Sequence, residues 1–292
     1  MRWSLSLPSL LAATVGALAV ITPAMGTVTR TLGEQEPRRV RLRTLRDGQL
    51  IEGSCPARYP RCLSFTFDDG PEWSTTPRLL DMLDARHIRA TFFVVGHRIS
   101  GPENHHRLNR GVLRDIARRG HRIGNHTFRH VVLDGLRPER IAREIDDTAE
   151  IITRETGRRP WLLRAPFGAL ASDRALKAVF SRRYTPVYWQ LDTEDWSVNS
   201  ARAVLLNFRR VLDESPRGGV VLMHDTRPWS VAAFPLILNE IDQRNARLVA
   251  QGQAPYRIVG LEHFWRPMGR RELPRGLPLP RRPRSGVRPA PR

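Results

Sequence analysis

From residue 63 onward, the sequence alternates between short apolar runs rich in β-branched and aromatic residues and longer amphipathic stretches. The short runs predict strands at residues 63–67, 90–95, 121–125, 161–163, 187–191, 220–223 and 257–259. The amphipathic stretches predict helices at residues 76–85, 111–119, 138–156, 173–181, 201–215 and 232–251. Strands that alternate with helices form βα units, which build parallel sheets through right-handed crossovers. The sequence therefore predicts an α/β fold, a distorted (β/α)7 barrel of the TIM-barrel type in one domain.

The predicted helix at 138–156 carries clear local signals. Pro138 lies near its first turn, where a missing N–H costs no hydrogen bond. Ile141 and Ile145 recur at helical spacing and mark one apolar face, while Glu144 is assigned to the opposite, polar face. We interpret this segment as a structural helix that covers the sheet.

The chain has 292 residues and a formal net charge of +19, carried almost entirely by arginine, since Lys177 is its only lysine. Such a charge indicates anionic surroundings, for example nucleic acid, phospholipid head groups or acidic envelope polymers. The codon bias of a GC-rich genome explains the arginine content equally well. No nucleic-acid-binding signature and no basic stretch with interleaved aromatic residues is present, so we expect no nucleic-acid partner.

The first 26 residues resemble an export signal. Arg2 precedes an apolar stretch at 5–25, and small residues at positions 24 and 26 fit the pattern that a signal peptidase cleaves. A retained membrane anchor is the alternative, because the stretch is nearly long enough to span a bilayer. We expect the protein to be exported and to be periplasmic, secreted or associated with the cell envelope.

Changes in composition divide the chain further. The part after the predicted signal is polar and rich in arginine, and the end of the chain is rich in arginine and proline with few large apolar groups. Such a tail buries too little apolar surface to fold by itself, and it is suited to contact with anionic envelope polymers. The predicted parts are a signal peptide at 1–26, an extension at 27–58, a folded domain at 59–265 and a disordered tail at 266–292.

Cys55 and Cys62 are the only cysteines. In an exported protein they are expected to form one disulfide that closes a small loop. Two free thiols are the alternative.

Ionisable residues follow five of the predicted strands. Active sites of parallel α/β folds lie at the carboxyl ends of their strands, so these residues are expected to meet at one edge of the sheet. Singly each pattern is weak, because an Asp-Asp-Gly sequence is usually a turn and two histidines four residues apart usually lie on a surface helix. Their combination, in this order, favours a hydrolytic site. The residues concerned are Asp68-Asp69-Gly70, His126 and His130, Arg164 to Gly168, Asp192 with Asp195-Trp196, and His224-Asp225.

The same residues carry a resemblance to a known family. The chain resembles the polysaccharide deacetylases, also called the NodB-homology proteins or carbohydrate esterase family four, from about residue 63 to residue 264. All five motifs of that family are present in order. They are Thr66-Phe67-Asp68-Asp69-Gly70, His126-Thr127-Phe128-Arg129-His130, Arg164-Ala165-Pro166-Phe167-Gly168, Asp192-Thr193-Glu194-Asp195-Trp196 and Leu222-Met223-His224.

The resemblance implies a role for each motif residue. Asp69, His126 and His130 are the implied metal ligands, with zinc expected and cobalt or nickel as alternatives. Asp68 is the implied general base on the attacking water, and Arg164 is implied to pair with it.

The later motifs complete the implied site. His224 is the implied general acid, kept charged by Asp195. The backbone N–H of Phe167 is implied to stabilise the oxyanion, and Trp196 and Leu222 are implied to surround the acetyl methyl group.

These roles predict an exported, metal-dependent enzyme that removes N-acetyl groups from amino sugars of a polymer. We expect peptidoglycan as the substrate and chitin-type oligomers as second choice, and we expect a monomer. Two alternatives stay open: an O-deacetylase of the acetyl-xylan-esterase type, and a carbohydrate-binding protein without activity. No role is predicted for His87, His97, His105, His106, His121 and His263, and Trp73 and Trp229 are predicted either to stack on a sugar ring or simply to pack.

Overall fold

The computed structural model describes residues 51–264. The predicted signal or anchor at 1–26, most of the extension at 27–58 and the tail at 266–292 lie outside these residues, so they stay predictions. Within the described part, no helix is both long enough and apolar enough to cross a bilayer.

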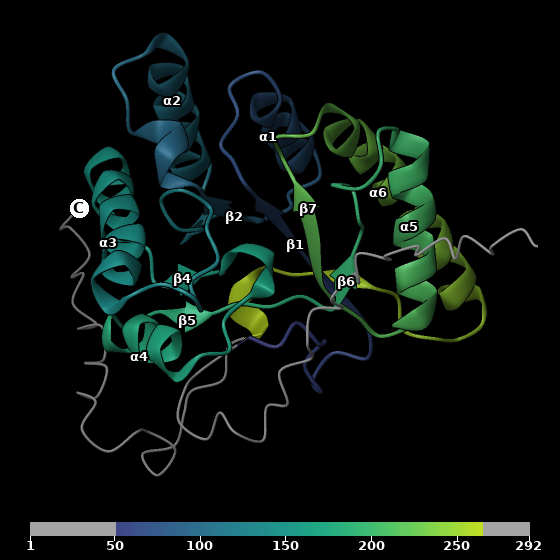
Figure 1. Cartoon of the computed structure of the whole chain (residues 1–292). Coiled ribbons are helices and arrows are strands. Elements are labelled where there is room, and N and C mark those ends of the chain that lie inside the picture. Colours follow the sequence, from purple (N-terminus) through teal and green to yellow (C-terminus); the bar gives the residue numbers. More distant parts are fainter. Residues whose placement is uncertain (1–50, 265–292) are drawn as a thin grey trace, which may run out of the picture. The chain divides into compact units, whose positions relative to one another are not determined.

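The strands form one curled, wholly parallel sheet, a half-barrel in which hydrogen-bonded neighbours follow the order β5-β4-β3-β2-β1-β7-β6, with β8 paired to β1. The α/β class with a seven-strand path is therefore confirmed. The helices lie around the outside of this sheet (Figure 1). The strands are β1 (Cys62–Asp68), β2 (Thr91–Val94), β3 (Arg122–Asn125), β4 (Leu162–Leu163), β5 (Thr185–Pro186), β6 (Leu191–Asp192), β7 (Gly218–His224) and β8 (Arg257–Ile258).

The helices are close to those that the sequence predicts. Three begin and end as predicted, because local signals mark their ends: a proline at the start of α1 and α3, a serine side chain that caps α4, and Gly157 in the left-handed conformation after α3. The helices are α1 (Thr76–Ala85), α2 (Asn104–Arg118), α3 (Pro138–Thr156), α4 (Asp173–Ser181), α5 (Ala201–Glu214) and α6 (Pro228–Ala250), with 3-10 turns η2 (Gly96–Ile99), η3 (Pro166–Gly168) and η4 (Leu261–Phe264).

The predicted strand at 187–191 is wrong. Two short strands flank this segment instead: β5 ends just before it, and β6 begins at its last residue, Leu191. The two strands lie at opposite ends of the sheet. Between them the backbone crosses the open side of the half-barrel, where Tyr188 N–H donates to the carbonyl of Ile51 and Gln190 N–H donates to the carbonyl of Val220. Val187 and Leu191 at the two ends of this segment are buried, but the residues between them do not form a strand.

The segment at 51–54 bridges the open side of the sheet at the same place. Ile51 pairs with Val187, and Ser54 pairs with Gly219 at the start of β7. The Cys55–Cys62 disulfide then ties this segment to β1, as predicted for the two cysteines.

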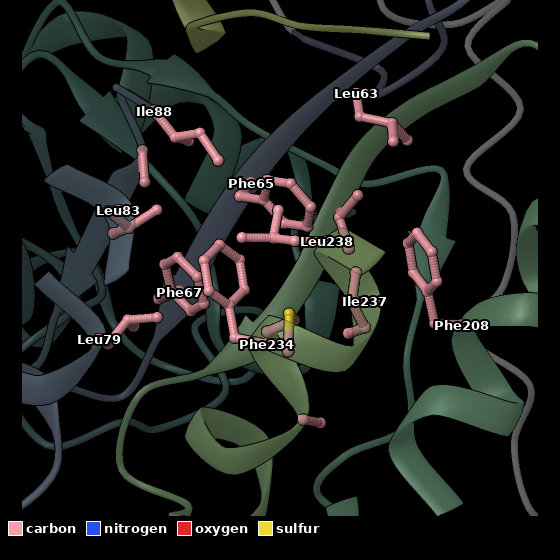
Figure 2. Close-up of a cluster of buried hydrophobic side chains, with 14 of the residues drawn as sticks. Leu63, Phe65, Phe67, Leu79, Leu83, Ile88, Phe208, Phe234, Ile237 and Leu238 are labelled. Atoms are coloured by element: carbon pink, nitrogen blue, oxygen red, sulfur yellow. The ribbon is translucent and has the colours of Figure 1, made fainter. Parts of the chain in front are cut away.

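The main core lies between the sheet and its helices. Alternate residues of β1 point to opposite faces, and Leu63, Phe65 and Phe67 all pack on the helix side. Phe234 of α6 meets Phe65 edge to face with ring centroids 5.1 Å apart, as Figure 2 shows for this cluster. The other face of β1 carries Thr66 and Asp68 and is turned away from this core.

This packing makes α6 a test of the core. Replacing Phe234 with alanine is expected to lower the free energy of unfolding by about 3–5 kcal/mol, because it leaves a cavity between α6 and β1. Leu236→Ala on the same helix is the control, since Leu236 is 39% exposed. It is expected to cost less than about 1 kcal/mol. Urea unfolding measures both, and equal losses would contradict the core assignment.

Candidate active site

The predicted site residues converge on the carboxyl ends of the parallel strands. Asp68 ends β1 and pairs in register with His224, which ends β7. His126 directly follows β3, and Arg164 directly follows β4. Because the strands are parallel, side chains that are far apart in sequence meet at one edge of the sheet, as predicted.

Arg164 is the fully buried centre of this edge. Its guanidinium donates to Asp68 Oδ1 and to the hydroxyl of Thr66, both at 2.8 Å. It also donates to the carbonyls of Val187 and Tyr188. The remaining face of the group stacks over the Phe93 ring, 4.3 Å from its centroid. A buried charge is tolerated only when it is paired and hydrogen-bonded in this way.

Asp69, His126 and His130 form a compact cluster beside this ion pair. Asp69 Oδ1 lies 3.1 Å from His130 Nε2 and 3.5 Å from His126 Nε2. One ligand atom from each of the three residues lies within 4.8 Å of the others. A carboxylate and two imidazoles at this separation can hold a divalent metal ion.

The hydrogen bonds of the cluster fit a metal ion. His126 Nδ1 donates to the carbonyl of Arg164 at 2.7 Å, so its Nε2 keeps a free lone pair that points toward Asp69. Within residues 51–264, the buried Oδ1 of Asp69 accepts no hydrogen bond. Burial would raise the pKa of Asp69, but the close approach of His126 and the nearby charges of His224 and His130 outweigh it and lower the pKa. The carboxylate is therefore ionised and ready to bind a cation.

A residue that the sequence reasoning missed holds the histidine turn. Glu144 was assigned to the exposed face of its helix, but it is buried, and its Oε2 accepts the backbone N–H groups of Phe128 and Arg129 at 3.0 and 2.8 Å. These bonds fix the turn between His126 and His130. Glu144 lies three residues after Ile141 and four before Thr148, so helical spacing places it beside the buried stripe. Its contact with a distant turn is set by the tertiary fold.

The turn itself has an unusual backbone. Thr127 and His130 have φ angles of 66° and 56°, in the left-handed region that non-glycine residues rarely adopt. The Asn125 side chain accepts the Thr127 N–H at 2.8 Å and supports this conformation. The two histidines therefore do not lie on one helix, and their spacing of four residues reflects a tight turn.

His224 and Asp195 form a second buried pair. Asp195 is fully buried and accepts both the backbone N–H and the Nδ1 of His224 at 2.7 Å. Burial opposes the charged imidazole, but the hydrogen bond and charge of Asp195, helped by Asp68 and Asp69, raise the pKa of His224 to about 9. His224 Nε2 lies 4.0 Å from Asp69 Oδ2, so the second nitrogen faces the metal cluster.

The three predicted substrate-contacting residues differ in exposure. Leu222 is buried on β7, two residues before His224 and therefore on the same face of the strand. Phe167 is 62% exposed with φ 61°, and its ring lies 4.8 Å from the ring of His130. Trp196 is also exposed and directly follows Asp195.

Three residues outside the five motifs have surroundings that the sequence did not predict. His105 and His106 lie in the first turn of α2, not in a loop, because this helix begins seven residues earlier than predicted, at residue 104 and not 111. His106 Nδ1 contacts Glu103 at 2.7 Å. The Trp229 side chain donates to the carbonyl of Asp195 at 2.7 Å, so it helps to hold the His224 pair.

Asp225 is a buried carboxyl group that the sequence reasoning left without a role. Thr76 donates to its Oδ2, and Thr75 donates to its carbonyl, so it joins β7 to the start of α1. Its carboxyl group packs directly against Gly70. A Cβ atom added to this glycine would lie 2.2 Å from Asp225 Oδ2. Burial raises the pKa of Asp225 to about 7, with partial opposition from Thr76 and Arg98. Asp225 therefore supports the turn after Asp69 in a largely neutral form at mildly acidic pH.

Comparison with known proteins places this site in context. A family model described as polysaccharide deacetylase matches residues 57–187. The peptidoglycan-N-acetylglucosamine deacetylase of Bacillus cereus is 34% identical over 191 residues, which are 64% of this chain and 66% of that protein. The chitooligosaccharide deacetylase of Rhizobium leguminosarum is 34% identical over 167 residues, which are 57% of this chain and 69% of that protein.

A solved structure agrees with these relatives. The peptidoglycan deacetylase PdaC from Bacillus subtilis matches with a TM-score of 0.58 and 27% identity, over 70% of this chain and 90% of that one. The chain thus belongs to the polysaccharide deacetylase family. It spans 66% of the length of the Bacillus cereus relative and 38% of several other curated relatives.

The buried Asp225 makes stability depend on pH. The pKa of Asp225 is raised in the folded state, so folding favours the protonated carboxyl group. The protonated group stabilises the fold fully below about pH 4, and this stabilisation is lost as the pH rises to about 7. Asp225→Asn cannot ionise. We expect the free energy of unfolding of this variant, relative to the parent protein, to increase between pH 4 and pH 7 by a few kcal/mol.

Chemical unfolding at several pH values, with a chelator present throughout, measures this difference. Asp242→Asn is the matched control, because Asp242 is exposed on α6 and pairs with Arg86. A pH-independent difference for Asp225→Asn would show that Asp225 is ionised in the folded protein across this range.

Proposed function

We propose that this protein is a metal-dependent hydrolase that removes N-acetyl groups from amino sugars of a polysaccharide. The observation that carries the proposal is the meeting of three groups at one sheet edge: the Asp69–His126–His130 cluster, the Asp68–Arg164 ion pair and the His224–Asp195 pair. Each group supplies one requirement of amide hydrolysis. Membership of the polysaccharide deacetylase family supports the same chemistry.

Asp69, His126 and His130 are the proposed metal ligands. We propose zinc, because a carboxylate with two imidazoles suits it, and cobalt or nickel also suits this donor set. When bound, the metal polarises the acetyl carbonyl and lowers the pKa of a water molecule.

Asp68 is the proposed general base. One of its oxygens is held by Arg164, and its Oδ2 lies 3.6 Å from His126 Nε2, on the side of the metal cluster. The guanidinium fixes the orientation of the carboxylate through a charge-assisted hydrogen bond. Asp68 takes a proton from the water that adds to the acetyl carbon.

His224 is the proposed general acid. With a pKa of about 9 it is charged at neutral pH, and Asp195 holds the Nδ1 proton so that Nε2–H faces the site. As the bond between the acetyl carbon and the nitrogen breaks, His224 delivers its proton to the departing amine. The products are acetate and a free amino sugar.

Backbone and apolar groups complete the proposed site. The N–H of Phe167 is proposed to stabilise the oxyanion, from a turn whose positive φ lifts this residue toward His130. Leu222 and Trp196 are proposed to enclose the acetyl methyl group. A small apolar pocket with a few directed polar groups suits an acyl group of two carbons.

We propose peptidoglycan as the polymer and an exported protein. Two features support this: the named activity of the Bacillus cereus relative, and a net charge of +19 that suits anionic wall polymers. The Cys55–Cys62 disulfide supports an oxidising compartment. Chitin-type oligomers are the second choice, supported by the Rhizobium leguminosarum relative.

Base and ligand roles can be separated by substitution. We expect Asp68→Asn to keep the metal and to lower turnover by about 10²–10⁴-fold, because it removes the proton acceptor. His126→Ala is expected to lose both the metal and turnover. Metal content by mass spectrometry, turnover, and folding by circular dichroism are measured together, with Asp242→Asn as a control at the surface. Near-normal turnover of Asp68→Asn would refute the base assignment.

The reaction itself is tested with purified protein, zinc, and N-acetylated peptidoglycan and chitin oligomers. We expect each turnover to release one acetate and expose one free amine, and we expect a chelator to abolish the reaction. Release of acetate with a free hydroxyl, from an O-acetylated polymer only, would identify an O-deacetylase. Binding of the oligomers without any acetate release would identify a carbohydrate-binding protein.

A further inference from the structure

A cavity lies at the opposite end of the sheet from the candidate active site. It has a volume of about 180 Å³. Arg89, His121 and Trp161 line it and come just before β2, β3 and β4 along the chain, whereas the metal cluster follows the other ends of the strands. We propose that this cavity binds a phosphate group.

The cavity is strongly basic. Arg89, Arg122, Arg158 and Arg159 all line it, against one acidic residue, Glu262. Arg122 and Glu262 are 3.5 Å apart, too far for a strong hydrogen bond. The guanidinium groups therefore keep N–H donors that can form hydrogen bonds to an anion.

Within the described part of the chain, two further ion pairs of these arginines are also long. Arg89 lies 3.6 Å from Asp84, and Arg159 lies 3.9 Å from Asp146. Arg158 makes no ion pair with any residue between 51 and 264. The cavity thus holds more positive charge than its own acidic neighbours neutralise.

His121 supplies an independent observation. The imidazole is 96% buried, and the Ala90 N–H donates to its Nδ1 at 3.3 Å. Burial lowers the pKa of His121 to about 4, so the ring is neutral and its proton is on Nε2. That Nε2–H has no acceptor among the described residues. A buried donor without a partner, in a cavity lined by arginines, indicates a site for an anionic acceptor.

Phosphate fits this donor set better than a carboxylate. Arginine binds phosphate oxygens in a bidentate manner, and the tetrahedral group presents oxygens in several directions. Donors here come from three segments: the start of β2, the start of β3 and the loop at 158–159. A planar carboxylate with two oxygens serves fewer of them.

The same chemistry is offered by a free phosphate ion and by a phosphodiester of an anionic polymer. The site is separate from the metal cluster, so it does not depend on the proposed deacetylation. If the phosphate belongs to an envelope polymer, the cavity would hold the protein on that polymer while the other sheet edge acts on acetyl groups. Only this anchoring role depends on the proposed deacetylase function.

Titration of ¹⁵N-histidine-labelled protein with inorganic phosphate, at fixed ionic strength, tests the site. We expect a saturable shift of the His121 Nε2–H signal. Arg158→Gln is expected to weaken binding about tenfold, because it removes a charged donor. The matched control is Arg202→Gln, which removes the same charge from an exposed position of α5.

The outcomes are distinct. An unmoved His121 signal, equal weakening by the two substitutions, or equally tight binding of acetate would overturn the phosphate site. A glycerol phosphate oligomer that binds more tightly than inorganic phosphate assigns the site to a polymer, and the reverse order assigns it to the free ion. Turnover on a soluble acetylated oligomer is measured in parallel, and we expect Arg158→Gln to leave it unchanged. Loss of phosphate binding with normal turnover separates this site from the deacetylase proposal.

Discussion

The buried side chain and carbonyl of Arg164 join the parts of the candidate active site. Its guanidinium holds Asp68 on β1, and its carbonyl accepts the Nδ1 proton of His126 after β3. One residue thereby orients the proposed base and sets the tautomer of a proposed metal ligand. A guanidinium is suited to this position because it stays charged when buried and its donors are fixed in a plane. Arg164 thus supports, from β4, the contact between Asp68 of β1 and His126 after β3.

The turns at the same edge show how much of the structure serves this site. Asp69, Thr127, His130 and Phe167 all have positive φ angles, which non-glycine residues rarely adopt. Such conformations persist only when surrounding bonds fix them. Here Asn125 and Glu144 accept backbone N–H groups of the histidine turn, and the Asp225 carboxyl group supports the turn after Asp69.

Charge is divided between the two ends of the sheet. Carboxylates and histidines gather at the carboxyl ends of the strands, and arginines gather around His121 at the other ends. The two edges therefore differ in the charge of the side chains they present. Local clusters, more than net charge, decide which ligand each edge attracts.

The α/β class, most of the helices and the set of ionisable residues that meet at one sheet edge could be predicted from the sequence. Helix ends at Pro138 and Gly157 were predictable because caps and prolines act within one turn of the chain. The pairing of Asp68 with Arg164 followed only from a family resemblance, and the structure shows the contact.

Tertiary structure alone decided the rest. It split the predicted strand at 187–191 between two sheet edges and buried Glu144 against a distant turn. It also left the Nε2–H of His121, in a basic cavity, without a partner among residues 51–264. Each of these depends on partners far along the chain. Local periodicity reports which side of an element is apolar, but it carries no information about which distant backbone or side chain will face the other side.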